Sequence, residues 1–145
     1  MALTHLHPAA AAGLAAWHRM IAEKNLSDLD KLIHADAVFR SPMAFKPYES
    51  GQAVALILRT VFGVFEDFAY HRELASEDGL SVVLEFSARV GERQLKGVDL
   101  IRFDDAGQIV DFEVMIRPMS ALQALGAEMG ARLGAVLPQF KAKTV

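Results

Sequence analysis

The spacing of apolar residues predicts helices in the first half of the chain. Pro8 suits the first turn of a helix that runs to about Lys24. Its apolar residues recur three or four positions apart along one face, at Leu14, Trp17, Met20 and Ile21. This spacing is typical of an amphipathic helix with its other side in solvent.

Two serines predict the starts of the next helices. Ser27 suits the N-cap of a short helix, SDLDKLIH, and Ser50 that of a helix from Gly51 to about Phe65. Between them, residues 37–41 are expected to form a short strand that Pro42 ends, followed by the loop MAFKPYES.

From Phe68 the period changes from 3.6 to 2, which predicts a run of antiparallel hairpins over residues 68–76, 80–90, 93–103 and 108–117. A Gly91-Glu92 turn would pair Leu84 with Asp99. It would also place Phe86 opposite Gly97, where the missing side chain leaves room for a ligand.

Asp99 is the residue that stands out in these strands. A turn at residues 104–107 would place Phe103 opposite Gln108, and Asp99 would then face Phe112. The face that carries Asp99 also carries Val114 and Ile116, so one carboxyl group lies among apolar side chains. A buried acid needs a partner or a role, and we interpret Asp99 as the marker of a pocket.

The first hairpin has two alternative registers. A two-residue turn at Asp78-Gly79 would put His71 and Glu73 on the pocket face. A three-residue turn would instead put there Phe68, Tyr70, Arg72 and Leu74. We favour the second register because it buries more apolar surface, and an inward Arg72 would pair with Asp99.

The helical spacing returns after Pro118, with an apolar stripe of Met119, Leu122, Leu125, Met129 and Leu133 on one face. Glycines at 126, 130 and 134 recur every four residues in this segment and weaken a helix. We expect them to allow close packing on the sheet or on a partner subunit.

Composition narrows the class of protein. The chain has 145 residues, is 52% hydrophobic and contains no linker, which predicts one domain over residues 1–145. Residues 1–7, which include His5 and His7, are expected to be disordered. A net charge of −3 without a basic stripe argues against nucleic acid as a partner. The apolar segments are too short for a membrane span, and no basic segment precedes the Ala-rich start.

The cysteine and histidine content limits the chemistry. The absence of cysteine excludes disulfides and fits a reducing compartment, so we expect a cytoplasmic protein. His18, His34 and His71 lack metal-ligand spacing, and we expect neither a metal nor a cofactor.

The order of these elements resembles the nuclear-transport-factor-2-like superfamily, which includes ketosteroid isomerases and SnoaL-like polyketide cyclases. The matching segments are NLSDLDKLIHADAVFRSP and GVDLIRFDDAGQIVDFEV, the second similar to the isomerase hairpin D-x-x-R-F-D-x-x-G-x-I. The resemblance covers nearly the whole chain. It implies a cystatin-like α+β fold: a cone-shaped, curved antiparallel sheet with helices packed in its concavity.

The resemblance also implies roles for three residues. Asp99 matches the aspartic acid that donates a hydrogen bond to the oxyanion of the isomerase reaction, for which the acid must stay neutral. The tyrosine of the family's first helix falls on Trp17, and its general base, an aspartate before a proline, falls on Ser41. Serine without an adjacent base is a poor proton acceptor, so steroid isomerisation by the family mechanism is not supported. An arginine two positions before Asp99, as in limonene epoxide hydrolases, is also absent.

Two functional hypotheses remain. One is a SnoaL-like or isomerase-type enzyme that uses Asp99 as its acid on a small, hydrophobic, cyclic or polyketide-like molecule. The other is a non-catalytic module that binds or carries such a molecule, and Ser41 favours it. The expected ligand contacts are Trp17, Ser41, Tyr48, Phe86, Phe112 and Ile116.

The resemblance also implies a homodimer through the convex face of the sheet. That face would carry charged residues alternating with apolar ones, namely Arg102, Asp111, Glu113 and Arg117 with Val98, Leu100 and Met115.

Overall fold

Helices and strands lie close to the predicted segments. The computed structural model describes residues 5–140. Its helices are α1 (Pro8–Glu23), α2 (Leu29–Leu32), α3 (Gly51–Val64) and α4 (Met119–Leu133), followed by the 3-10 turn η1 (Leu137–Phe140). Its strands are β1 (Ile33–Arg40), β2 (Tyr48–Glu49), β3 (Glu66–Ala75), β4 (Ser81–Val90), β5 (Arg93–Phe103) and β6 (Ile109–Arg117).

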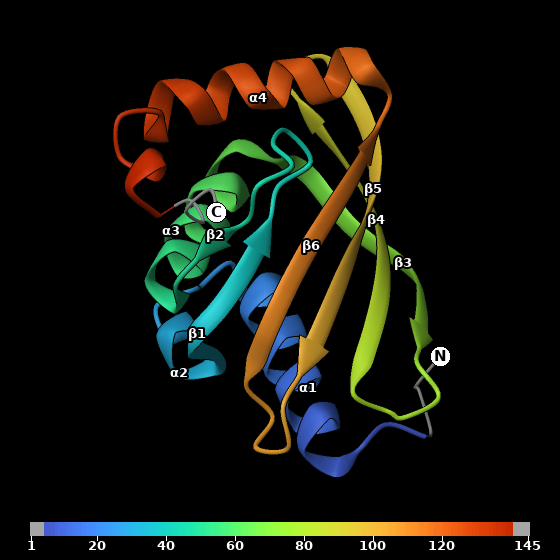
Figure 1. The fold of residues 1–145 in the computed structure, drawn as a ribbon. Coiled ribbons are helices and arrows are strands. Elements are labelled where there is room, and N and C mark those ends of the chain that lie inside the picture. Colours follow the sequence, from blue (N-terminus) through green and yellow to red (C-terminus); the bar gives the residue numbers. More distant parts are fainter. Residues whose placement is uncertain (1–4, 141–145) are drawn as a thin grey trace.

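The six strands form one curved, unclosed sheet in the order β2-β1-β6-β5-β4-β3. Helices α1 and α3 lie on its concave side, and α4 crosses one end (Figure 1). The predicted α+β cone is therefore confirmed. The sheet is not purely antiparallel, because β1 runs parallel to β6. Strands β1 and β6 are far apart in the sequence, separated by β2, α3 and the strands β3 to β5. Because no single tight turn joins them, their pairing does not have to be antiparallel.

Side-chain and backbone hydrogen bonds fix most helix ends. Ser50 Oγ accepts from the Ala53 N–H at 2.9 Å and caps α3, as predicted. Ser27 caps nothing. Its backbone N–H donates to Asn25 Oδ1 at 3.0 Å, and α2 is a single turn that begins at Leu29, so residues 33–36 belong to the strand. The N-cap of α2 is thus Asp28 rather than Ser27, and Asn25 forms an Asx turn just before it.

The start of α1 is attached to the β3–β4 turn. His7 Nδ1 accepts from the Ala9 N–H, and the His7 N–H donates to Gly79 O at 3.0 Å. Residues 1–4 of the N-terminal segment expected to be disordered lie outside the described residues. Within residues 5–140, no helix has the length and apolar character needed to cross a membrane.

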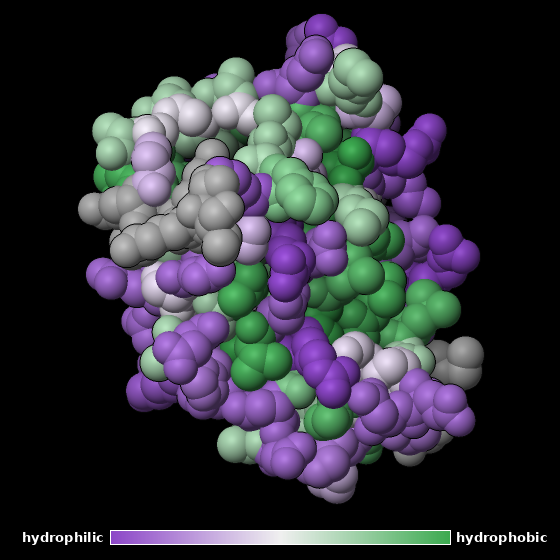
Figure 2. Space-filling model, in the orientation of Figure 1, coloured by the Kyte–Doolittle hydropathy of each residue, from purple (hydrophilic) through white to green (hydrophobic). Residues whose placement is uncertain are grey.

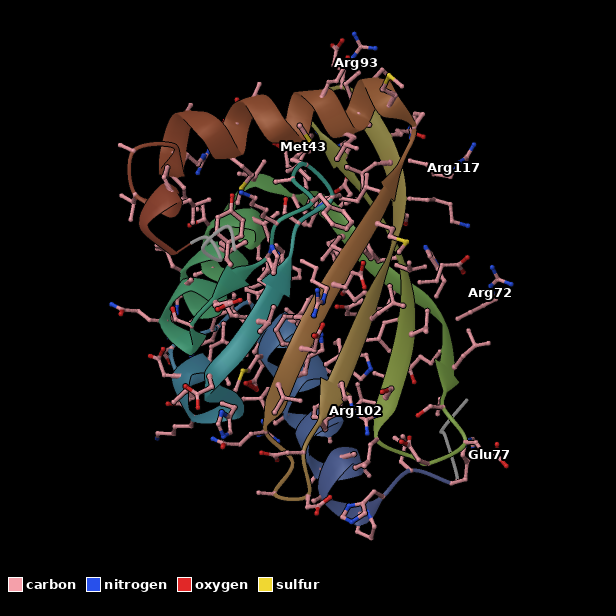
Figure 3. All side chains as sticks on the ribbon, in the orientation of Figure 1. Met43, Arg72, Glu77, Arg93, Arg102 and Arg117 are labelled. Carbon is pink, nitrogen blue, oxygen red and sulfur yellow. The ribbon has the colours of Figure 1, made fainter. Side chains whose placement is uncertain are left out.

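The convex face of the sheet mixes charge with apolar surface. Figure 2 shows hydrophobic and hydrophilic side chains interspersed over the strands. Arg72 points outward (Figure 3) and pairs with Glu85, with Nη2 2.7 Å from Oε2, while Arg40 pairs with Asp111 at 3.1 Å. Met115 is 52% exposed on this face.

Candidate functional site

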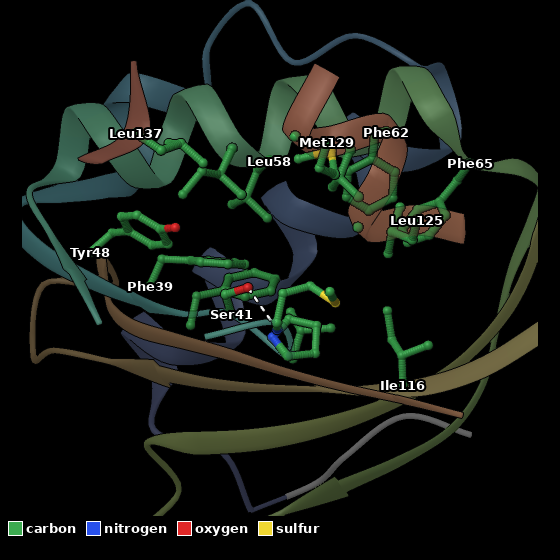
Figure 4. Close-up of a pocket in the computed structure, with 18 of the residues that line it drawn as sticks. Phe39, Ser41, Tyr48, Leu58, Phe62, Phe65, Ile116, Leu125, Met129 and Leu137 are labelled. Carbon is green, nitrogen blue, oxygen red and sulfur yellow. Dashed lines mark hydrogen bonds between the residues drawn. The ribbon is translucent and has the colours of Figure 1, made fainter. Parts of the chain in front are cut away.

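An apolar cavity of about 290 Å³ lies between the concave face of the sheet and helices α3 and α4 (Figure 4). Its volume is at the small end of ligand pockets, which are typically about 300–1,000 Å³. Most of its lining is aromatic or aliphatic. Among the described residues, the polar side chains that line it are Ser41, Tyr48 and Asp99.

Strand pairing places Asp99 on the cavity side of β5. Its neighbours are Leu84 on β4, as predicted, and Val114 on β6 in place of the predicted Phe112. The β5–β6 loop is one residue longer than expected, so Phe103 pairs with Ile109, and a bulge after Arg102 adds a second shift. Two one-residue shifts restore the original facing, so Asp99 and Phe112 still share the concave face.

A directed chain of hydrogen bonds holds one oxygen of Asp99. Tyr70 Oη donates to Asp99 Oδ2 at 2.7 Å, and Trp17 Nε1 donates to Tyr70 Oη at 2.9 Å. An indole N–H is only a donor, so Tyr70 accepts from Trp17 and turns its own proton toward Asp99. Among the described residues, no hydrogen-bond partner is found for Asp99 Oδ1.

Burial dominates the electrostatics of this pair. Asp99 is 4% exposed, and loss of solvation raises the pKa of its carboxyl group to about 7, although the hydrogen bond from Tyr70 lowers it. Burial also raises the pKa of Tyr70 well above its ordinary value, and the neighbouring Asp99 raises it further. Tyr70 therefore stays a neutral donor, whereas Asp99 exchanges its proton near neutral pH.

A bulge in β3 decides which residues reach Asp99. Tyr70 pairs with Phe86 and Glu73 pairs with Leu84, so the register changes by one residue between them. Both Tyr70 and Glu73 therefore face α1, where Trp17 and His18 meet them. The predicted pairing of Arg72 with Asp99 and the predicted inward Leu74 are wrong. Arg72 lies within the bulge and pairs with Glu85 on the outer face, and Leu74 lies beyond the bulge and is 55% exposed.

The structure brings most of the predicted site residues together. Those that line the cavity with Asp99 are Ser41, Tyr48, Phe86, Phe112 and Ile116. Ser41 Oγ also accepts from the Met43 N–H at 3.0 Å (Figure 4). Trp17 is absent from this lining. Its fully buried ring packs edge-on against Phe112 of the cavity wall, with centroids 5.4 Å apart, and its indole N–H is linked to Asp99 through Tyr70.

The space expected in front of Gly97 does not exist. A Cβ atom at Gly97 would lie 2.5 Å from Phe86 Cζ and 2.6 Å from Met115 O. The glycine accommodates the ring of its cross-strand neighbour rather than a ligand.

The favoured register correctly put Phe68 on the cavity side, but sequence reasoning missed Tyr70 as the partner of Asp99 and Phe65 as a cavity wall. Phe68 stacks on Phe86 with centroids 5.1 Å apart. The available signal was the alternation of Phe68 and Tyr70 in the favoured register. No three His, Cys, Asp or Glu residues gather into a candidate metal site within residues 5–140.

Comparisons with known proteins identify the family and the fold of this chain. The family model described as SnoaL-like domain matches residues 14–112. A steroid delta-isomerase from Pseudomonas aeruginosa is 67% identical, with a TM-score of 0.89 over 94% of this chain and 99% of that chain. The comparison with curated proteins found no match.

Two further solved structures support the fold. A protein with a cystatin-like fold from Silicibacter pomeroyi is 31% identical, with a TM-score of 0.82 over 94% of this chain and 96% of that one. A nuclear-transport-factor-2-like protein from Mesorhizobium loti is 14% identical, with a TM-score of 0.68 over 81% of this chain and 98% of that one, and shows the fold alone. By sequence and by fold, this chain belongs to the family of SnoaL-like domains.

Proposed function

We propose that the cavity binds a small, mainly apolar molecule that carries one oxygen substituent, and that Asp99 Oδ1 contacts that oxygen in isomerase-type or cyclase-type acid-base chemistry. The observation that carries the proposal is the chain from Trp17 through Tyr70 to Asp99. It occupies Oδ2 and leaves Oδ1 of the cavity's carboxyl group available to a ligand.

The direction of this chain determines what Oδ1 can do. When Asp99 is neutral, Oδ2 already accepts from Tyr70, so the proton lies on Oδ1 and can be donated to a carbonyl or enolate oxygen. When Asp99 is ionised, Oδ1 accepts from a hydroxyl group instead. The pKa of about 7 makes both forms available near neutral pH.

The 67% identical relative named as a steroid delta-isomerase supports the enzymatic form of the proposal. In such a double-bond shift, a base removes a proton from the carbon between the ketone and the double bond. Neutral Asp99 would stabilise the enolate oxygen, and a proton would return at the far carbon of the former double bond. The base is the missing part, since Ser41 is a weak proton acceptor.

The alternative is a non-catalytic module that binds or carries the same kind of molecule. The observation that favours it is the lining of the cavity, in which Asp99 is the only carboxyl or basic side chain among the described residues. A carrier needs the shape and the single polar contact but no second proton-transfer group.

Binding is tested with a matched pair of probes, 4-butylphenol and butylbenzene. We expect the phenol to raise the melting temperature of the wild type more, with about five- to tenfold tighter binding because of one hydrogen bond to Asp99. Asp99→Leu should abolish this preference, and Asp105→Leu on the exposed β5–β6 turn should retain it. Equal binding of the two probes by the wild type would reject the assignment of Oδ1.

Catalysis is tested with 5-androstene-3,17-dione, whose conversion to a conjugated ketone changes the ultraviolet absorbance. Ser41→Asp adds a carboxylate at the cavity wall and should raise the rate on the order of 100-fold over wild type, whereas Ser41→Asn should not. Turnover by Ser41→Asp that is lost in the double variant with Asp99→Leu would support the enzyme. If the variants still bind the phenol but none turns over the steroid, the result would support the non-catalytic carrier instead of the enzyme.

A further inference from the structure

We infer that Gly130 on α4 determines how long a ligand the cavity accepts. This inference rests on the proposed function, because it concerns the same cavity and the same unpartnered Oδ1 of Asp99. Gly130 lines the cavity, and a Cβ atom added to it would meet no atom within 4 Å. Gly130 is also exposed, so the position is a part of the cavity wall that adjoins solvent and from which a side chain is missing.

The other two glycines of the predicted stripe differ from Gly130. A Cβ atom at Gly126 would lie 2.5 Å from Cε of Met43, whose side chain lies against α4 (Figure 3), and one at Gly134 would lie 2.5 Å from Gly130 O. Crowding by Met43 of the β1–β2 loop and by the preceding turn of α4 thus accounts for Gly126 and Gly134, although neither contact is with the sheet or a partner subunit as expected. No such contact accounts for Gly130.

A glycine inside a helix needs such an account because it lowers helix stability relative to alanine. Gly130 lies in the last turn of α4, in ordinary helical conformation, so backbone geometry does not require glycine there. What glycine provides at this position is empty volume next to Met129, Gly134 and Leu137 of the cavity wall.

The chemical consequence is a length limit. A ligand whose oxygen contacts Asp99 extends its apolar part along the cavity, and each buried methylene strengthens binding about fourfold until the wall is reached. A methyl group at position 130 should bring that wall closer by about one methylene. Valine and leucine should bring it closer still.

The experiment measures binding of 4-alkylphenols from 4-methylphenol to 4-octylphenol by calorimetry. In the wild type we expect affinity to rise about fourfold per methylene up to a limit. In Gly130→Ala the limit should come one methylene earlier, and in Gly130→Leu two to three earlier, with about tenfold weaker binding of the longest probe. The shortest probe should bind all three proteins equally.

Gly63→Ala is the matched control. Gly63 lies on the exposed side of α3, outside the cavity lining, and a Cβ atom there would approach only Arg132 Nη1, at 4.0 Å. Both alanine variants should melt about 3–4 °C above the wild type because both remove a helical glycine. Only Gly130→Ala should shorten the accepted chain.

The outcomes separate this inference from the proposed function. If no alkylphenol binds the wild type, the proposed function fails. If the wild type binds the series and the limit is the same in Gly130→Leu, the role of Gly130 is overturned while the cavity assignment stands. A limit that moves equally in Gly63→Ala would also overturn it.

Discussion

Asp99 should make the folded protein less stable as the pH rises, and Asp99→Asn should remove that effect. The folded protein holds the Asp99 proton with a pKa of about 7, against 3.8 for an ordinary aspartate in the unfolded chain. Between these two values the folded state keeps a proton that the unfolded state has lost. Stability contributed by this proton is therefore full below about pH 4 and is lost as the pH passes about 7.

The size of the effect follows from the same two values. At 1.36 kcal/mol for each unit between 3.8 and about 7, the penalty reaches about 4 kcal/mol. The asparagine of the variant carries no charge and can still accept from Tyr70. We therefore expect Asp99→Asn to be close to wild type at pH 4 and more stable by several kcal/mol at pH 8.

Urea unfolding followed by circular dichroism at pH 4 to 8 measures the free energy of unfolding of both proteins. The other titrating groups are the same in both, so the difference between the curves reports Asp99 alone. A difference that stays constant with pH, or that favours the wild type at pH 8, would refute the assignment of Asp99 as a buried acid.

Three further predictions concern the same framework. Tyr70→Phe should raise the pKa of Asp99 above about 7, visible in a carbon-detected carboxyl titration, and should destabilise the protein by about 1–3 kcal/mol because Trp17 Nε1 loses its acceptor; an unchanged titration would contradict the network. Gly97→Ala should cost about 1–3 kcal/mol in unfolding experiments, since its Cβ would press on Phe86, and a neutral effect would show that the sheet adapts. We also expect a homodimer through the convex face that Met115→Glu converts to a monomer in light scattering, and a wild type of monomer mass would reject it.

The elements were predictable from sequence because local signals set their bounds. The Ser50 cap, the Gly91 turn and the change of period at Phe68 each depend on neighbours within a few positions. The parallel pairing of β1 with β6 depends on contacts between distant segments. No periodicity within β1 could specify it.

The partner of Asp99 could not be predicted because β3 changes register within the strand. Each of the two sequence registers describes one part of it: Phe68 and Tyr70 face inward before the bulge, and Glu73 faces inward after it. Simple alternation applies a single register to a whole strand, so it placed Arg72 beside Asp99. On β6 the predicted residue pairs were wrong, but the predicted side of the sheet was right for Phe112. Two shifts of one residue each leave the side chains after the bulge on their predicted face.

The position of Trp17 makes the site observable by an intrinsic optical signal. It is the only tryptophan in the sequence, its indole N–H is two hydrogen bonds away from Asp99, and its ring contacts Phe112 of the cavity wall. Its fluorescence should therefore respond both to the charge of Asp99 and to occupation of the cavity. The unlabelled protein thus contains one emitter that can follow proton uptake and ligand arrival in real time.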